Sequence, residues 1–477
     1  SSSSNATSLE FMTGASEAAT VKFAIASDGS LSTPTAGTSN VRFGVNAGNS
    51  IASGGNYNVT IGDEAGTALS TGDNNVAVGY AAFDSATDQN GNVAIGYNAL
   101  TAVTASGDTL CTAVGSQALD ANTAGYHNTA VGFAAQDANT HGIRNVSVGR
   151  DSLGSDTKGS QSVAIGDSAL ATQNFTTATD SYNTAVGYFA GNAVTTGQYN
   201  TFVGNASGDA VTDADENVAV GYNSLSTNTL GNRTVAIGTG ALRDMNFTTA
   251  TDSHNTAVGH SSGQAVSTGT NNTFVGSNSG VANTTGGDNV FMGYRTGDAN
   301  TTASGNVAIG KDAFTTNVAG ARNTALGTAT LANMTSATAA NMYNTAVGYG
   351  AGTSVTSGTE NTLLGSQAGE ALTTGTTNVA LGSQALKVDT KGNNSIAIGY
   401  GALKTQNFST STSTGNIAIG YDAGLSITTG TSNVFIGIGA GDGTDDGTTN
   451  VAVGHGALSA NCTSGNVAVG NLAGAAC

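Results

Sequence analysis

Residues 75–100 read NVAVGYAAFDSATDQNGNVAIGYNAL and contain one pentad twice, ending first at Gly79 and again at Gly96. Versions of this pentad, N-[VT]-A-[VI]-G, end at 25 glycines between Gly44 and Gly470. Of the 24 spacings between these glycines, 17 are 17 residues long, four are 21, and the others are 16, 18 and 19. A fixed period of this length is typical of repeat architectures and outweighs local propensity in deciding the fold.

Alternation within the pentad predicts a short strand in every repeat. The residue before the pentad glycine is always apolar, as at Val78, and the residue three before it is Val, Ile or Thr, as at Val76. These two share one face of the strand, and the residue between them, usually Ala as at Ala77, occupies the other face. We expect the larger residues to be buried and a second strand to follow the glycine, with glycines at the two turns.

Each repeat is then one coil of a solenoid, and one coil cannot stand alone. Two buried β-branched side chains contribute about 3 to 6 kcal/mol, whereas ordering a 17-residue backbone costs about 17 to 34 kcal/mol. Parallel stacking in register must supply the difference. The sequence therefore predicts an all-β fold, a parallel β-solenoid of about 25 coils over residues 40–477.

Residues 1–39 do not fit the repeat, and we interpret them as an N-terminal connector or cap. Alternating apolar residues at Val21, Phe23 and Ile25 predict a strand there, and Asp28-Gly29 predicts a turn. In the repeats, the asparagine that opens most pentads, as at Asn75, is expected to form a ladder of amides that bond to one another or to turn backbone.

The strip of Ala and Ser on the small-residue side of the strands has two interpretations. A flat surface of small residues suits close contact with neighbouring chains, and we expect three such rods around one axis. The alternative is a lone solenoid that keeps these small residues inside a very thin core.

Charge and cysteine content limit the function classes. The chain of 477 residues has 13 Lys and Arg against 31 Asp and Glu, a formal charge of -18, which argues against nucleic acid and anionic membranes as partners. It has no apolar run of 18 residues, so we expect no membrane insertion. Cys111, Cys462 and Cys477 share no metal-ligand spacing and are interpreted as isolated residues rather than a disulfide framework.

Two segments carry a family resemblance. NVAIGYNAL at residues 92–100 and NTAVGYGAG at 344–352 resemble the repeats of long phage and virion tail-fibre proteins. SVAIG at 162–166 and SIAIG at 395–399 are similar to the head repeats of trimeric autotransporter adhesins, although those repeats are shorter. The resemblance implies a homotrimeric fibre on a virion or cell surface, joined to other fibre or virion subunits at its ends.

We therefore expect a structural fibre that presents or contributes to host attachment, with a host surface glycan or receptor as a further partner. The alternative is a bacterial cell-surface adhesin or extracellular filament subunit that binds through its sides. We expect no enzyme and no cofactor, because the histidines at 127, 254, 260 and 455 stand where other repeats have Tyr and form no catalytic constellation.

The long repeats hold the candidate contact residues. Three of them insert nearly the same residues, namely Gln173-Asn174-Phe175-Thr176, Met245-Asn246-Phe247-Thr248 and Gln406-Asn407-Phe408-Ser409. Each Phe either folds back over the neighbouring coil or projects to contact a partner chain or glycan. Tyr182, Tyr199 and Tyr343 stand beside Asn, which suits either sugar stacking or a plain stacking role.

Two acidic stretches are candidates for calcium at the corners of coils. They run from Asp209 to Glu216 and from Asp442 to Asp446. Carboxylate oxygens in a loop are the ligands that Ca²⁺ prefers. Neither stretch recurs from coil to coil, unlike calcium sites in repeats built around the ion.

Overall fold

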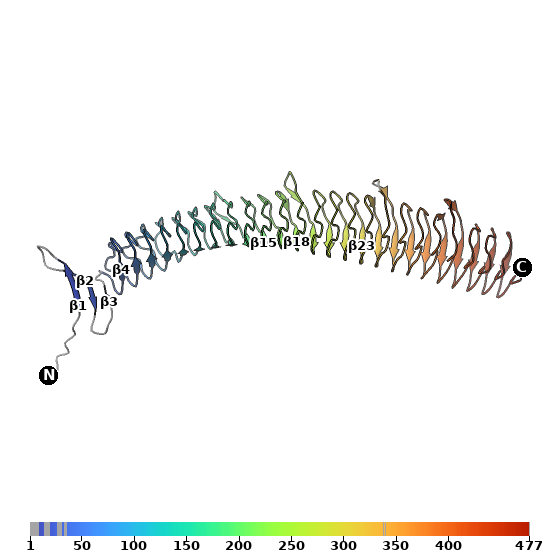
Figure 1. Cartoon of the computed structure of the whole chain (residues 1–477), viewed down its shortest axis with the longest axis horizontal. Helices are drawn as coiled ribbons and strands as arrows, with labels where there is room; N and C mark the ends of the chain where they lie inside the picture. Colours follow the sequence, from blue (N-terminus) through green and yellow to red (C-terminus); the bar gives the residue numbers. More distant parts are fainter. Residues whose placement is uncertain are drawn as a thin grey trace, which may run out of the picture. The chain divides into compact units, whose positions relative to one another are not determined.

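The computed structural model describes residues 9–13, 20–25, 31–32, 36–336, 338 and 340–476. The chain divides into two compact units, Ser1–Leu230 and Gly231–Cys477. In each unit the backbone winds through successive coils that stack on one another (Figure 1). The prediction of an all-β parallel solenoid with about 25 coils and a period of about 17 residues is confirmed. The predicted turn at Asp28-Gly29 lies outside the described residues, as does Cys477.

The first unit begins with a small antiparallel sheet. Its strands are β1 (Leu9–Thr13), β2 (Thr20–Ile25) and β3 (Leu31–Ser32), with β2 in the centre. Strand β2 contains the residues whose alternation predicts a strand. The coils that follow contribute one three-residue strand each.

In the first unit these are β4 (Val41–Phe43), β5 (Val59–Ile61), β6 (Val76–Val78), β7 (Val93–Ile95), β8 (Thr112–Val114), β9 (Thr129–Val131), β10 (Val146–Val148), β12 (Val163–Ile165), β14 (Thr184–Val186), β15 (Thr201–Val203) and β16 (Val218–Val220). In the second unit they are β18 (Val235–Ile237), β20 (Thr256–Val258), β21 (Thr273–Val275), β22 (Val290–Met292), β23 (Val307–Ile309), β25 (Thr324–Leu326), β27 (Thr345–Val347), β28 (Thr362–Leu364), β29 (Val379–Leu381), β31 (Ile396–Ile398), β33 (Ile417–Ile419), β34 (Val434–Ile436), β35 (Val451–Val453) and β36 (Val467–Val469). Within each unit, neighbouring strands pair in parallel with equivalent residues opposite each other, as Val76 faces Val93.

The four long coils each add a short second pair of parallel strands. These pairs are β11 (Gly159–Ser160) with β13 (Thr179–Asp180), β17 (Gly231–Asn232) with β19 (Thr251–Asp252), β24 (Gly320–Ala321) with β26 (Ala340–Asn341), and β30 (Gly392–Asn393) with β32 (Thr412–Ser413). The inserted residues therefore belong to the hydrogen-bonded stack at their bases.

The prediction of a second strand in every coil is wrong. The second and fourth residues after the pentad glycine have positive φ, for example 52° at Asn98 and 54° at Leu100. Alternating left-handed residues cannot form an extended strand. The segment still bonds from coil to coil, since the Asn98 N–H donates to the Tyr80 carbonyl at 3.1 Å.

The strands turn the opposite face toward the interior from the one predicted. Ala77 and Ala94, at the strand centres, are fully buried, whereas Ile95 is 38% exposed. A three-residue strand turns only its central side chain inward, and the returning backbone of the coil leaves little room opposite it. The alternative that keeps the small residues inside a thin core is therefore the one that the structure adopts.

The core conserves volume between two positions that face each other. The strand centre at Phe202 is large, and the two positions that face it are both glycine. These are Gly191 and Gly208, each four residues after a pentad glycine. A Cβ on Gly208 would lie 2.4 Å from a Phe202 ring carbon. Where the centre is Ala, as at Ala94, the facing position can hold a buried Leu100. This exchange keeps the interior closely packed.

The asparagine ladder is confirmed. The Asn75 N–H donates to Asn58 Oδ1 at 2.9 Å, and Asn75 Nδ2 donates to the Gln89 carbonyl at 2.8 Å. The same bond recurs in the next coil, where the Asn92 N–H donates to Asn75 Oδ1. The amides thus satisfy backbone groups at a buried turn, where an unpaired group would be costly.

Candidate interaction surfaces

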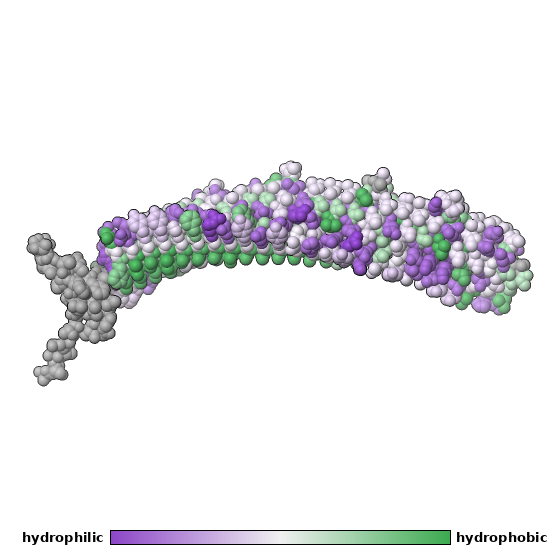
Figure 2. All heavy atoms as spheres, in the orientation of Figure 1, coloured by the Kyte–Doolittle hydropathy of each residue, from purple (hydrophilic) through white to green (hydrophobic). Residues whose placement is uncertain are grey.

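The outward side of the strands forms an apolar strip that we call the strand face. It consists of the residues one and three positions before each pentad glycine, all of which are Val, Ile, Leu, Met, Phe or Thr. Ile61, Ile95 and Ile165 are each 38% exposed in it. Figure 2 shows the strand face of the first unit as an unbroken apolar band.

The strand face of the first unit is as large as the largest apolar patch of a typical monomer. Eleven strands of the first unit contribute to it. At about 4.8 Å between strands and about 7 Å between alternate residues, it covers on the order of 400 Å². The largest apolar patch on a typical monomer covers about 300 to 600 Å² and is often functional. The strand face is therefore the leading candidate for an interaction surface.

Tyrosines line the edge of the strand face, one position after the pentad glycine. The rings of Tyr80 and Tyr97 stack with their centroids 5.7 Å apart, and those of Tyr400 and Tyr421 stack at 5.2 Å. Stacking along the coils turns one face of each ring toward its neighbour. The four tyrosines nevertheless remain 44 to 54% exposed.

The three candidate tyrosines beside Asn are exposed but already have partners. Tyr182 and Tyr199 lie in adjacent coils and stack at 5.3 Å with an interplanar angle of 17°. The Arg322 guanidinium lies 5.7 Å from the Tyr343 ring centroid and donates to its hydroxyl at 2.8 Å. Both arrangements fit the plain stacking role better than a free sugar platform.

The inserted phenylalanines fold back over their neighbours and do not project. Phe175, Phe247 and Phe408 are 5 to 6% exposed. Burial of a Phe side chain is worth about 1.5 to 3 kcal/mol, which stabilises the base of each insertion. The hypothesis that these rings contact a partner or glycan as projecting groups is wrong.

The asparagines of the same insertions are exposed at the edge of the coils. The Asn174 side chain accepts a hydrogen bond from Thr157 Oγ1 at 3.1 Å, and Asn407 accepts one from Thr390 Oγ1 at 3.0 Å. The Asn246 N–H donates to the Ser267 carbonyl. These three side chains belong to separate coils and do not converge on one site.

A buried polar network under two of the insertions escaped the sequence analysis. Asp156 accepts hydrogen bonds from Gln173 Nε2 at 2.6 Å, the Gly159 N–H at 2.9 Å and the Phe175 N–H at 3.1 Å. Burial raises the pKa of this carboxyl, and the bond from Gln173 acts in the opposite direction. The signal in the sequence is the Asp that precedes each Gln-Asn-Phe by one coil.

The second network has the same geometry. Asp389 accepts from Gln406 Nε2 at 2.6 Å, from the Gly392 N–H at 3.0 Å and from the Phe408 N–H at 3.2 Å. Burial again raises the pKa of the carboxyl. Both networks anchor an insertion, and neither opens to the solvent.

The cysteines differ in state. Cys111 is free and buried, and burial raises the pKa of its thiol to about 11. It stands in the asparagine ladder, where its N–H donates to Asn92 Oδ1 at 2.9 Å. Cys462 is disulfide-bonded, so the interpretation of three isolated cysteines is wrong for this residue.

The acidic stretches bond across coils. Asp213 accepts from Thr195 and Thr196, and Asp445 accepts from Thr428. Among the residues that the structure describes, no three His, Cys, Asp or Glu side chains are grouped so as to hold a metal ion. Calcium at these corners therefore gains no support from the geometry.

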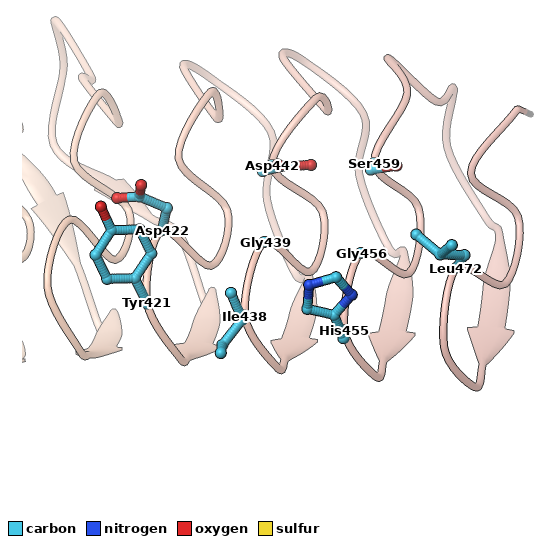
Figure 3. Close-up of a pocket in the computed structure, with 9 residues that line it drawn as sticks. All are labelled: Tyr421, Asp422, Ile438, Gly439, Asp442, His455, Gly456, Ser459 and Leu472. Carbon is cyan, nitrogen blue, oxygen red and sulfur yellow. The ribbon is translucent and has the colours of Figure 1, made fainter.

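A groove with a volume of about 320 Å³ crosses the last coils of the second unit. Tyr421, Ile438 and His455 form one wall (Figure 3), each just after a strand of successive coils. Asp442 and Ser459 lie on the other wall. The floor consists of Gly439 and Gly456, and Asp422 and Leu472 complete the lining.

Comparison of the chain with protein-family models, with curated proteins and with solved structures gave no match. The described part of the chain has no helix of the length and apolarity that a membrane crossing requires. The surfaces above are therefore the basis for assigning a function.

Proposed function

We propose that the chain is a non-enzymatic structural subunit of a fibre on a virion or cell surface, and that its copies associate through the strand face. The observation that carries this proposal is the continuous apolar strip without a charged residue in a chain whose formal charge is -18. An exposed strip of this kind costs free energy in water and gains it on burial against another chain.

A homotrimer suits this surface. The strand face has two side-by-side columns, one containing Val76 and Val93 and the other Val78 and Ile95. In a ring of three parallel chains, each chain faces two neighbours, so each column can serve one of them. The resemblance to tail-fibre repeats supports the same assembly and suggests attachment of a virion to its host as its role.

The four long coils favour a second candidate, an adhesin or filament subunit that binds through its sides. Thr176, Thr177 and Ala178 of the first insertion are exposed, and so are Thr248 and Thr249 of the second. Exposed loops on a rigid scaffold commonly carry binding functions. Deleting the inserted residues and measuring attachment to host cells separates the two candidates, since a fibre stalk keeps its attachment and a lateral adhesin loses it.

Light scattering after size-exclusion chromatography tests the assembly. We expect about three times the chain mass of 46.5 kDa. Lysine at Val131, Val148 and Ile165, three consecutive positions of the strand face, is expected to reduce the mass to that of one chain. Lysine at the exposed Thr87, Thr104 and Ser106 is the matched control and leaves the mass unchanged.

A single-chain mass for the unmodified protein would refute the proposal. An unchanged mass for the strand-face variant would refute the assignment of the interface. Circular dichroism of each variant verifies that its coils remain folded.

A further inference from the structure

The groove near β34 and β35 exists because two neighbouring coils lack a side chain at the same position. Gly439 and Gly456 are each two residues after a pentad glycine, where other coils hold Asn98, Gln117 or Asn223. They are the only two consecutive repeats of the sequence with glycine there. Both have φ near +60°, as the other residues at this position do, so the backbone follows its usual course and the missing side chains leave a hollow.

The polar lining of the groove is rich in acceptors. Asp442 is half-buried, and its Oδ2 faces the glycine floor, 3.1 Å from where a Cβ on Gly439 would lie, whereas its Oδ1 is inaccessible to solvent. A donor in the groove can therefore pair with Oδ2, and a charged donor forms the stronger hydrogen bond with a carboxylate. Asp422 adds a second carboxylate, and the groove has neither Lys nor Arg in its lining.

The other wall is apolar and aromatic. Tyr421 and Ile438 are both more than half exposed there and offer a ring and an aliphatic surface. An aromatic ring attracts an organic cation through its negative face. His455 lies beside them, with its Nδ1 3.2 Å from Asn471 Oδ1.

We propose that this groove binds a small organic ammonium ion, a primary amine on a compact apolar body. The ammonium group donates to Asp442 and is attracted by Asp422, while the apolar body lies on the glycine floor against Tyr421 and Ile438. The volume of about 320 Å³ is at the lower end of the range for ligand sites, which fits a single small ring. This proposal does not rest on the fibre assembly, because no residue of the strand face lines the groove, although Tyr421 stands at the edge of that face.

Other ligand classes fit the groove less well. An anion would meet two carboxylates with no Lys or Arg in the lining to offset them. A metal ion needs several grouped ligands, and the described residues hold no group of three carboxylate, imidazole or thiol ligands. A neutral alcohol can donate to Asp442 but gains nothing from the negative charge.

Three probes with one ring separate these classes. Saturation-transfer difference NMR on the full chain compares cyclohexylamine, cyclohexanol and cyclohexanecarboxylate. We expect the amine to bind about tenfold more tightly than the alcohol, as a charge-assisted hydrogen bond requires, and the carboxylate not to bind. Equal binding of the amine and the alcohol, or no binding of the amine, would overturn the proposal.

Two variants locate the site. Asp442→Asn is expected to weaken the amine about tenfold, to the level of the alcohol. Gly439→Asn fills the floor with a residue that other coils accept at this position, and is expected to abolish binding. Gly240→Asn, at the equivalent position of another coil where a Cβ would meet only Ser261 Oγ at 3.7 Å, is the matched control and keeps full binding.

An Asp442→Asn variant that binds the amine as tightly as the original chain would overturn the proposal. So would a folded Gly439→Asn variant with unchanged binding, where the circular dichroism spectrum establishes that it is folded. The oligomeric mass serves as a separate readout, since failure of the fibre proposal leaves the amine result unaffected.

Discussion

Gln173 Nε2 donates a 2.6 Å hydrogen bond to Asp156 Oδ2 across a separation of 17 residues, one turn of the solenoid. Asp389 and Gln406 form the same pair. In the long coil where Met334 replaces the glutamine, Asn317 replaces the aspartate, and both are fully buried. The two positions therefore change together inside one chain, as expected for side chains that satisfy each other.

The first prediction concerns the pH dependence of stability. Because the pKa values of Asp156 and Asp389 are raised in the folded chain, the folded state holds these protons more tightly than the unfolded state. Their contribution to stability is therefore lost as the pH rises from the ordinary aspartate pKa through the raised values. Each pKa unit corresponds to about 1.4 kcal/mol per carboxyl.

Replacement of both carboxyls by Asn removes this dependence. The stability of the D156N/D389N variant relative to the original chain is expected to increase as the pH is raised from 3 to 7. Thermal unfolding followed by circular dichroism measures this difference. Asn is the natural residue at the equivalent Asn122 and Asn139, which supports normal folding. A variant whose advantage is greater in acid than at neutral pH would contradict the prediction.

The second prediction concerns the coupling between Asp156 and Gln173. Q173M removes the donor to a buried carboxylate oxygen and is expected to destabilise the first unit by about 1 to 3 kcal/mol. Adding D156N recreates the Asn317 and Met334 pair and is expected to recover at least about 1 kcal/mol. Denaturant unfolding of both single variants and the double variant gives the coupling energy, and strict additivity would refute the pairing.

The number of coils and the glycine corners could be predicted because they depend on the period and on backbone geometry alone. Gly79, with φ of +130°, lies so close to the next coil that a Cβ would be 2.5 Å from the Gly96 carbonyl oxygen. The asparagine ladder followed from the same register. These features need no knowledge of which side of a strand faces inward.

Which face of each strand is buried could not be predicted from alternation, because alternation separates the two faces without saying which one points inward. Larger residues are usually inside, but here the return segment with left-handed Asn98 and Leu100 narrows the interior until only Ala94 fits at the strand centre. One signal was available in the sequence. Gly208 follows the large Phe202, whereas Leu100 follows Ala94, and this exchange of size indicates that the two positions face each other.

The third prediction tests that exchange. G208L places a side chain where a Cβ alone would approach Phe202 to 2.4 Å, and F202A leaves a cavity worth about 3 to 5 kcal/mol. The double variant F202A/G208L recreates the Ala and Leu arrangement of Ala94 and Leu100. It is expected to be more stable than either single variant in denaturant unfolding, and a double variant no better than F202A would contradict the packing described.

The fourth prediction uses Cys111 as a reporter of opening in the first unit. Its thiol is buried with a pKa of about 11, so at pH 8 only about one molecule in a thousand carries the reactive thiolate. Iodoacetamide is expected to label Cys111 more than a hundredfold more slowly in the folded chain than in urea. A cysteine placed at the exposed Ser85 is the matched control and is expected to react at the rate of an unfolded thiol.

The same position tests the ladder, because Cys111 stands where other coils have Asn. In C111N, Nδ2 of the new asparagine can donate to the Gly125 carbonyl, which the Cys111 Sγ reaches only at 3.6 Å. A net hydrogen bond of this kind is worth about 0.5 to 1.5 kcal/mol, so we expect C111N to raise the unfolding free energy by that amount. Rapid labelling of folded Cys111, or a C111N variant less stable than the original chain, would show that the ladder does not run through this coil as described.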